Sequence, residues 1–278
     1  QLGRALSMSR NNIKIGVILQ GAETPFMKEV LKGIQEACAE VDNLGGTVLV
    51  HKIEHQNAED VILAMEKMRM EEVRGIAMVP LDEERVKREI DRFVEEFRIP
   101  VVTFTSDVED TKRLCFVGQN GVQCGRAAAG LMGELTGGKG KVAVISGYST
   151  NTSLSSRVVG FREEIARKYP GIEIIGPEYC FEENGRAREI TEGIFKDVPD
   201  LDGIYLTSHG EEGVCEAIAG AGKAGQVKMV ANDFMGRNYE LMREGFIHFL
   251  IGQDARIQGY EPVMILFRLL FNGEAPER

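Results

Sequence analysis

Apolar residues follow two alternating patterns along the chain. Ile13–Leu19 is a nearly continuous apolar run, which is typical of a strand buried on both faces of a parallel sheet. A short polar loop follows, and Thr24 and Pro25 then predict the start of a helix, with Thr24 as its N-cap. From Phe26 to Val41 the apolar residues recur at helical spacing. The chain therefore begins with a strand, a polar loop and a helix.

This alternation continues to the end of the chain. A helical pattern lies between most neighbouring strands, and the last helix, Gln258–Phe271, is strongly apolar. Repeated strand–helix units predict parallel sheets with helices on both faces. The remaining strands are expected at Thr47–Ile53, Gly75–Val79, Ile99–Phe104, Leu114–Gly118, Lys141–Ser146, Ile172–Phe181, Gly203–Thr207, Val227–Ala231 and Phe246–Ile251.

The repeat is interrupted once. The polar segment Thr105–Asp110 leads into the apolar run Leu114–Gly118 with no helical pattern between them. We interpret this step as a passage from one sheet to a second. The predicted fold class is α/β, with two doubly wound parallel-sheet lobes. We expect a linker at residues 1–12, a first lobe at 13–117 plus 253–278, and a second lobe at 118–252.

The composition is that of an ordinary globular protein, with 278 residues, 43% hydrophobic residues and a net charge of −10. The negative charge predicts that the chain itself repels nucleic acid and anionic membranes. No apolar run is long enough to span a bilayer. The five cysteines are far apart and form no Cys-x-x-Cys motif, which favours free thiols in a reducing compartment.

No cofactor and no metal site are expected. The glycine cluster Gly137–Gly140 precedes a strand, whereas a phosphate-binding loop follows one and opens a helix. His51 and His55 are four residues apart, but they lie at a strand end, where this spacing does not place both on one face. The pair is therefore a poor metal site.

Three aspartates, Asp107, Asp233 and Asp254, lie near strand ends, where ligands bind in doubly wound sheets. Paired carboxylates serve acid–base catalysis, but they also accept hydrogen bonds from hydroxyl groups. Nothing beside them resembles a nucleophile or a metal set, so we favour binding and do not expect an enzyme. Two residues stay open: Phe26 either contacts a ligand or packs under its helix, and His209 is either a ligand contact or a surface residue.

Several motifs resemble a known family when they are taken in order. They are the loop Thr24–Met27, the two crossing segments Phe116–Asn120 and Ile251–Asp254, the strand end Val230–Asp233, and the Gly259-Tyr260 pair. Together they resemble periplasmic sugar-binding proteins and the lactose/galactose-repressor (LacI/GalR) family, and the resemblance covers nearly the whole chain. It implies the type I periplasmic-binding-protein fold, with a small sugar or polyol bound in the cleft between the lobes.

The segment Gly3–Arg10 selects one branch of this resemblance, because it looks like the hinge that joins a repressor's DNA-binding headpiece to its sensor. We therefore expect the effector-binding part of a LacI-type transcriptional regulator, bacterial and cytoplasmic. The resemblance implies a carbohydrate effector, a homodimer, and operator DNA bound only through an absent helix-turn-helix. Two rivals remain: a sugar-binding protein of an ABC transporter, and a sugar-acting hydrolase or isomerase that uses Asp107 and Asp233.

The resemblance also assigns roles to single residues. Phe26 matches the ring that stacks on a sugar, and Asp233 and Gln253 match hydroxyl-binding positions. By spacing, Ser155 stands where the family has an arginine, and Arg157 is expected on roughly the opposite face of that helix, so the identity of the sugar cannot be transferred. The expected ligand contacts are Thr24, Phe26, Thr105, Ser106, Asp107, Asn151, Ser155, His209, Asp233 and Gln253.

Overall fold

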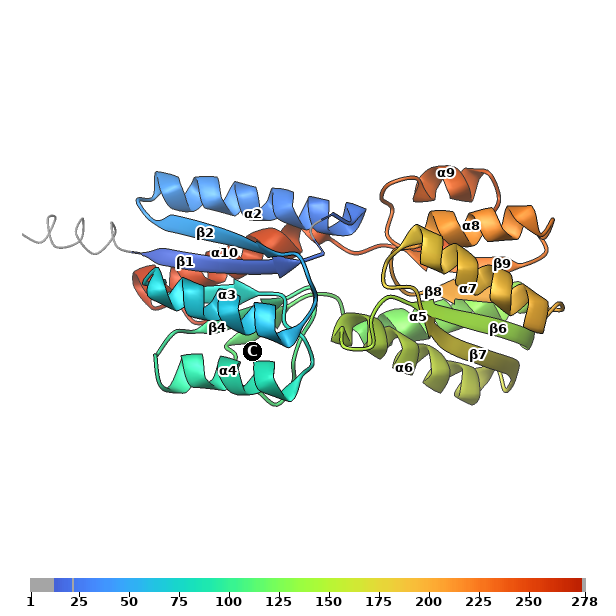
Figure 1. Ribbon diagram of the computed structural model, residues 1–278, viewed down its shortest axis with the longest axis horizontal. Coiled ribbons are helices and arrows are strands. Elements are labelled where there is room, and N and C mark those ends of the chain that lie inside the picture. The colour runs from blue at the N-terminus through green and yellow to red at the C-terminus, as the bar shows by residue number, and fades with distance from the viewer. Residues whose placement is uncertain (1–12, 22, 277–278) are drawn as a thin grey trace, which may run out of the picture. The chain divides into compact units, whose positions relative to one another are not determined.

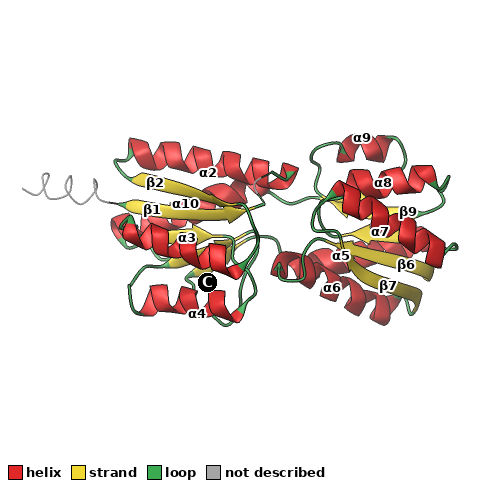
Figure 2. Ribbon diagram, in the orientation of Figure 1, coloured by secondary structure: helices red, strands yellow, loops and turns green. Residues whose placement is uncertain are grey.

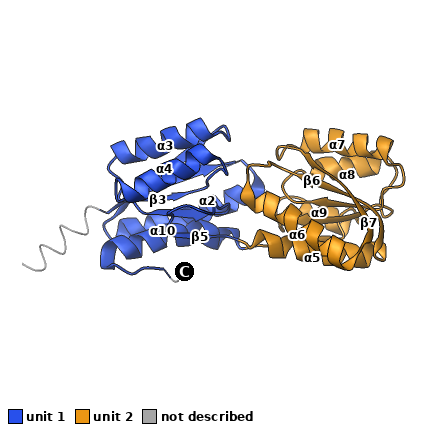
Figure 3. Ribbon diagram, turned by 90° about the horizontal axis from the view of Figure 1, so that it is seen from below, with its two compact units in different colours: residues 1–118, 254–278 blue, residues 119–253 orange. Residues whose placement is uncertain are grey.

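Strands and helices alternate along residues 13–21 and 23–276, which the computed structural model describes, and they gather into two units (Figure 3). Unit 1 consists of Gln1–Gly118 and Asp254–Arg278, and unit 2 of Gln119–Gln253. The expected lobe boundaries, at 117/118 and 252/253, differ from these divisions by one residue each. The expected linker at residues 1–12 lies outside the described residues.

Unit 1 is a five-stranded parallel sheet between two layers of helices (Figures 1 and 2). Its strands are β1 (Lys14–Gln20), β2 (Thr47–Ile53), β3 (Gly75–Met78), β4 (Val101–Phe104) and β5 (Cys115–Val117), in the order β2-β1-β3-β4-β5. Its helices are α2 (Pro25–Asn43), α3 (Ala58–Met70), α4 (Glu84–Glu95) and α10 (Ala255–Asn272). Helices α3 and α4 pack on one face and α2 and α10 on the other. Strand β1 lies inside this sheet, so nearly all of its residues are buried.

Unit 2 repeats this architecture. Its strands are β6 (Lys139–Ser146), β7 (Gly171–Tyr179), β8 (Gly203–Leu206), β9 (Lys228–Asn232) and β10 (Phe249–Ile251), in the order β10-β9-β8-β6-β7. Helices α5 (Gly121–Thr136) and α6 (Thr152–Lys168) cover one face. Helices α7 (Asn184–Asp197), α8 (Glu211–Gly220) and α9 (Asn238–Arg243) lie on the other. The predicted α/β class with two parallel sheets is confirmed.

One prediction about the sheets is wrong. The apolar run at Leu114–Gly118 does not pass into a second sheet, because it forms β5, the edge strand beside β4 in the sheet of unit 1. The two strands are parallel, with Val102 opposite Cys115. A parallel pair needs a connection that returns to the starting end of the sheet. These strands are so short that the return covers only about 10–15 Å, and the irregular segment at residues 105–114 is long enough without a helix.

Each sheet has a position where the strand order reverses, which is where ligands bind in doubly wound folds. In unit 1 it lies between β1 and β3, and in unit 2 between β6 and β8. Polar groups meet at both positions. The buried Gln20 amide, at the end of β1, donates to the Val79 carbonyl oxygen at 2.9 Å. The hydroxyl of Ser146, the last residue of β6, and that of Thr207, which follows β8, lie 2.7 Å apart.

Glycines allow helices α2 and α10 to approach backbone to backbone. A Cβ atom added at Gly33 would lie 2.0 Å from the Arg256 carbonyl oxygen, and one at Gly259 would lie 2.0 Å from that of Val30. Real Cβ atoms essentially never come within 3.0 Å of another heavy atom. Both positions therefore require glycine at this helix spacing.

Helices α5 and α6 show the same arrangement in unit 2. A Cβ atom at Gly125 would lie 2.0 Å from the Arg157 carbonyl oxygen, and one at Gly160 would lie 2.1 Å from that of Val122. The close approach fixes the backbone of α6 at Arg157, whose side chain belongs to the candidate site.

No helix within residues 13–21 and 23–276 is long and apolar enough to cross a membrane.

The glycine contact predicts opposite effects for two alanine substitutions on α5. Gly125→Ala should lower the free energy of unfolding by about 1–3 kcal/mol, because its methyl group would overlap the α6 backbone. Gly130→Ala, where an added Cβ meets nothing within 4 Å, should raise it by about 0.5–1 kcal/mol. Urea unfolding followed by circular dichroism measures both. A Gly125→Ala protein as stable as the parent would contradict the proposed contact.

Candidate functional site

Arg157 is the central polar residue at the carboxyl end of the unit 2 sheet. It lies on α6 and is only 3% exposed. Its Nη1 donates to the Thr207 carbonyl oxygen at 2.5 Å, and its Nη2 donates to Gln119 Oε1 at 2.8 Å. Its Nε is buried and has no hydrogen-bond partner among the described residues. A buried charged donor without a partner is costly, so this atom is available for a ligand.

Ser155 and Arg157 do lie on opposite faces of α6, but the expectation that Ser155 is on the side of the site is wrong. Arg157 lies on the buried face, together with Leu154, Val158 and Phe161, at the i, i+3, i+4 spacing of a helix stripe. Ser155 is two residues away, about 200° around the helix, and its hydroxyl donates to the Thr152 carbonyl oxygen at 3.4 Å. In the sequence, the apolar residues three and four positions from Arg157 already indicate that it lies on the face of α6 that packs on the sheet.

Asp233 directly follows β9 and provides an acceptor at the same sheet edge. Its backbone is in the left-handed region, with φ of 68°. Its Oδ2 lies 3.5 Å from Gln253 Nε2, while its Oδ1 is buried and has no partner within the described chain. Burial raises the pKa of Asp233 to about 6, although the Arg157 charge and the Gln253 hydrogen bond act in the other direction.

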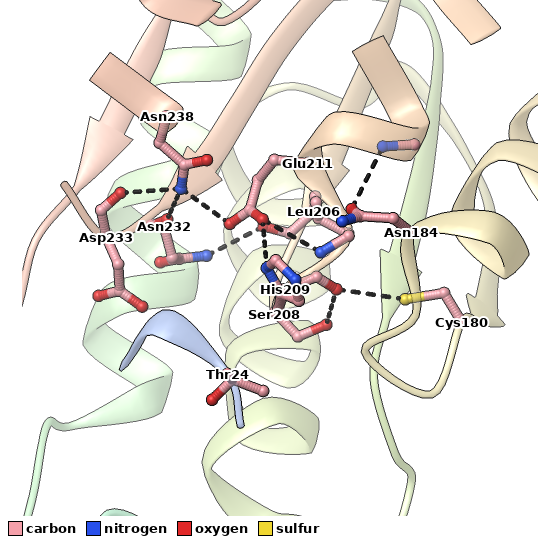
Figure 4. Close-up of polar contacts among 12 residues, drawn as sticks. Thr24, Cys180, Asn184, Leu206, Ser208, His209, Glu211, Asn232, Asp233 and Asn238 are labelled. Atoms are coloured by element: carbon pink, nitrogen blue, oxygen red, sulfur yellow. Dashed lines mark hydrogen bonds and ion pairs between the residues drawn. The ribbon is translucent and has the colours of Figure 1, made fainter. Parts of the chain in front are cut away.

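Glu211 holds the loop after β8 in place (Figure 4). Its Oε2 lies 2.9 Å from His209 Nδ1, and its Oε1 accepts from Asn238 Nδ2 at 2.9 Å. The Asn238 amide also donates to the carbonyl oxygens of Asn232 and Asp233, at 3.3 and 3.1 Å. The hydrogen bond to Glu211 raises the pKa of His209. This network fixes the backbone around Asp233, and the sequence analysis did not identify Glu211 or Asn238.

The predicted contacts in unit 1 lie at strand ends, but several already have partners. Thr24 caps α2, since its Oγ1 accepts from the Met27 amide at 3.2 Å. The Asp107 carboxylate accepts from the Thr103 hydroxyl at 2.6 Å and forms a two-pronged ion pair with Arg113. This aspartate is therefore engaged by the protein.

The other predicted contacts differ in exposure. Thr105, with φ of 59°, and Ser106 are buried, and Phe26 is half-buried. Asn151 caps α6, because its Oδ1 accepts from the Leu154 amide at 3.3 Å. The contact role of each of these residues stays a prediction. Within the described residues, no group of three or more His, Cys, Asp or Glu side chains is placed to hold a metal ion.

The comparison with known families decides between the branches of the resemblance. Residues 15–275 match the pattern that defines the periplasmic binding protein domain. The chain belongs to this family. The D-allose-binding periplasmic protein of Escherichia coli (strain K12) is 23% identical over 248 residues, covering 86% of this chain and 78% of the relative.

Two further similarities agree with this family. The D-ribose/D-allose-binding protein of Pseudomonas aeruginosa is 26% identical over 227 residues, covering 78% of this chain and 69% of the relative. The crystal structure of GanP, a glucose-galactose binding protein from Geobacillus stearothermophilus, superimposes with a TM-score of 0.87 at 24% identity. It covers 95% of this chain and 93% of that chain. Both curated relatives are named as sugar-binding proteins.

The identification as a LacI-type transcriptional regulator is therefore wrong, and with it the expected operator DNA and cytoplasmic location. The relatives are periplasmic binding proteins for sugars. The motifs that carried the resemblance describe a fold that both groups share, so they could not separate them. The segment that selected the regulator, Gly3–Arg10, lies outside the described residues. The comparisons give no support to the expected homodimer.

The cysteine argument for a reducing compartment also fails. All five cysteines are free, and three of them, Cys124, Cys180 and Cys215, are buried. Burial raises the pKa of each of these thiols, to about 12 for Cys215. The thiolate is the form that is oxidised, so buried thiols with a raised pKa are unreactive. They do not require a reducing compartment.

The raised pKa of Asp233 predicts a pH dependence of stability. In an unfolded chain an aspartate has a pKa near 3.9, so between about pH 4 and 6 the folded protein keeps a proton that the unfolded chain releases. The stability contributed by this group is complete below about pH 4 and is lost as the pH rises through 6. The Asp233→Asn protein does not lose stability in this way, because the asparagine side chain does not titrate. Its stability relative to the parent should increase by about 2 kcal/mol between pH 4 and 7. Urea unfolding of both proteins at several pH values tests this, and a difference that does not change with pH would contradict the buried carboxylate.

Proposed function

We propose that this chain is a solute-binding protein that captures a small sugar for an ABC-type transporter and does not convert it. One observation carries the proposal: Arg157 Nε and Asp233 Oδ1 are buried at the same sheet edge without partners in the described chain. Arg157 Nε needs a hydrogen-bond acceptor, and Asp233 Oδ1 needs a hydrogen-bond donor. Each such atom left unpaired costs roughly 1–3 kcal/mol, which a ligand with both kinds of group recovers.

A sugar hydroxyl suits this pair because it donates one hydrogen bond and accepts others. Hydrogen bonds to ionised groups are the strong ones, and here both the guanidinium and the carboxylate are charged partners. The relatives support the same ligand class, since their names describe binding of allose and ribose. Gln253, which lies beside Asp233, offers an amide that can take part as donor or acceptor.

Nine of the ten predicted contacts stay as individual proposals, Ser155 is withdrawn because it faces away from the sheet edge, and Arg157 is added. Asp233 and Gln253 are the strongest of the ten, because Asp233 has a buried acceptor without a partner. The rival function, a hydrolase or isomerase that uses Asp107 and Asp233, fits less well. Asp107 is already bound to Arg113 and Thr103, which leaves it poorly suited to exchange protons with a substrate.

A thermal-shift screen against pentoses, hexoses and polyols tests the proposal. A sugar present at a hundred times its dissociation constant should stabilise the protein by about 2.7 kcal/mol. Calorimetric titration with the sugar found should then show about 10–100-fold weaker binding by Asp233→Asn, because a ligand hydroxyl would lose its charged acceptor.

Asp200→Asn is the matched control for this titration. Its carboxylate is exposed, pairs with Lys141 at 2.8 Å and lies near the amino end of the same sheet, so binding should not change. Chemical analysis of the recovered sugar should show no product. If every sugar in the panel fails to shift the melting temperature, or if Asp233→Asn binds as tightly as the parent, the proposed site is wrong.

A further inference from the structure

The turn after β7 places an acidic side chain beside this site. Phe181 and Glu182 both have left-handed backbones, with φ of 54° and 61°, a conformation that non-glycine residues adopt only when the surroundings enforce it. Hydrogen bonds to the end of β6 provide that enforcement. The Cys180 amide donates to the Ser146 carbonyl oxygen at 2.8 Å, and the Phe181 amide donates to that of Gly147 at 3.2 Å. Two consecutive strained residues at a strand end point to a function for the side chains they position.

The Glu182 side chain lies against Gly147. A Cβ atom added at Gly147 would be 2.8 Å from Glu182 Cγ and 3.1 Å from Ser208 Oγ. Glycine at position 147 therefore leaves the space through which Glu182 reaches the switch point between β6 and β8. The carboxylate lies near enough to Arg157 and Asp233 for each of their charges to act on its pKa.

Negative charge is in excess at this sheet edge. The charges that act on the Glu182 carboxylate are those of His209 and Arg157, which attract it, and those of Glu211 and Asp233, which repel it. Glu211 is bound to His209 and Asn238, but no hydrogen bond or ion pair joins the Glu182 carboxylate to another described residue. Burial, followed by the charges of Glu211 and Asp233, raises the pKa of Glu182, while His209 and Arg157 act to lower it.

An aromatic pair adjoins this carboxylate. The rings of Tyr148 and Phe181 are 5.4 Å apart, and Phe181, the residue before Glu182, is 46% exposed. Burial and then the Glu182 charge raise the pKa of Tyr148. Aromatic faces attract cations, and an aromatic pair beside a carboxylate is a suitable surface for an ammonium group.

We propose that the ligand of this site is an amino sugar and that Glu182 is the residue that binds its ammonium group. The proposal deepens the proposed function and rests on it. An ammonium donates three hydrogen bonds and carries the charge that the sheet edge lacks, whereas a hydroxyl supplies a donor without charge. Arg157 Nε and Asp233 Oδ1, both buried and unpartnered in the described chain, serve the hydroxyl groups of the same molecule.

Calorimetric titrations at pH 7.4 test this with three sets of sugars. The first set is glucosamine, galactosamine and mannosamine, the second is their parent hexoses, and the third is their N-acetyl derivatives, which have similar shape but no charge. At least one amino sugar should bind ten times or more tightly than its parent and its N-acetyl derivative. Glu182→Gln, which removes the charge and keeps the shape, should abolish that preference.

Glu183→Gln is the matched control, because Glu183 is the exposed neighbour whose side chain makes no capping hydrogen bond to α7, and it should keep the preference. If neutral sugars bind and amino sugars bind no more tightly, the inference is wrong while the proposed function stands. If Glu182→Gln keeps the preference, Glu182 is not the recognising residue. If no compound of either kind binds in these titrations and the wider sugar screen is also negative, the proposed function fails as well. Thermal unfolding of both variants confirms that they are folded.

Discussion

The close contact between α5 and α6 is the constraint on which the candidate site depends. Gly125 brings the α5 backbone against the carbonyl of Arg157, and Gly160 brings α6 against Val122 in return. Side chains at either glycine would push the helices apart, and the guanidinium of Arg157 would move with α6. A site that holds a ligand through buried hydrogen bonds tolerates displacements of only about 0.5 Å. Helix packing on one face of the sheet thus determines the geometry at its carboxyl end.

Residues with a left-handed backbone follow several strands, and at each of these strand ends the conformation has the same structural effect. Thr105 follows β4, Glu182 follows β7 by three residues, and Asp233 follows β9, each with φ near 60°. A residue in this conformation turns the chain sharply, so the side chain stays beside the strand end instead of continuing along the strand. The conformation is unfavourable for residues with a Cβ by roughly 1–2 kcal/mol, and it persists because the surrounding hydrogen bonds enforce it. For Asp233 one of these is the bond from the Asn238 amide to its carbonyl oxygen.

The sequence predicted most elements because buried parallel strands and amphipathic helices have distinct periods. It failed where a feature depends on contacts distant in sequence. The connection to β5 contains no helix, and only the sheet itself shows that Cys115–Val117 pairs with β4. Ser155 was placed on the side of the site by a family spacing, whereas the apolar neighbours Leu154, Val158 and Phe161 assign that side to Arg157. The regulator identification failed for another reason, since a shared fold carries no information about what the ligand-binding event controls.

Asp107 and Asp233 show why the residues of a site cannot be ranked from sequence alone. Each follows a buried strand of a parallel sheet, and by position alone each was a candidate for binding hydroxyl groups. Only the family resemblance separated them, by matching Asp233 to a hydroxyl-binding position. In the structure the two carboxylates differ in their partners. Asp107 is neutralised by Arg113 and also accepts from Thr103, so its acceptor capacity is used by the loop that returns to β5. Asp233 lacks such an ion pair, retains a buried oxygen without a partner in the described residues, and has a pKa raised to about 6 by burial.

A carboxylate that the protein leaves unsatisfied gains more from a ligand than one that is already paired, because the ligand then removes an existing penalty. The same reasoning applies to Glu182, whose carboxylate is repelled by the charges of Asp233 and Glu211. A ligand donor that also carries positive charge offsets both the cost of burying this carboxylate and the repulsion.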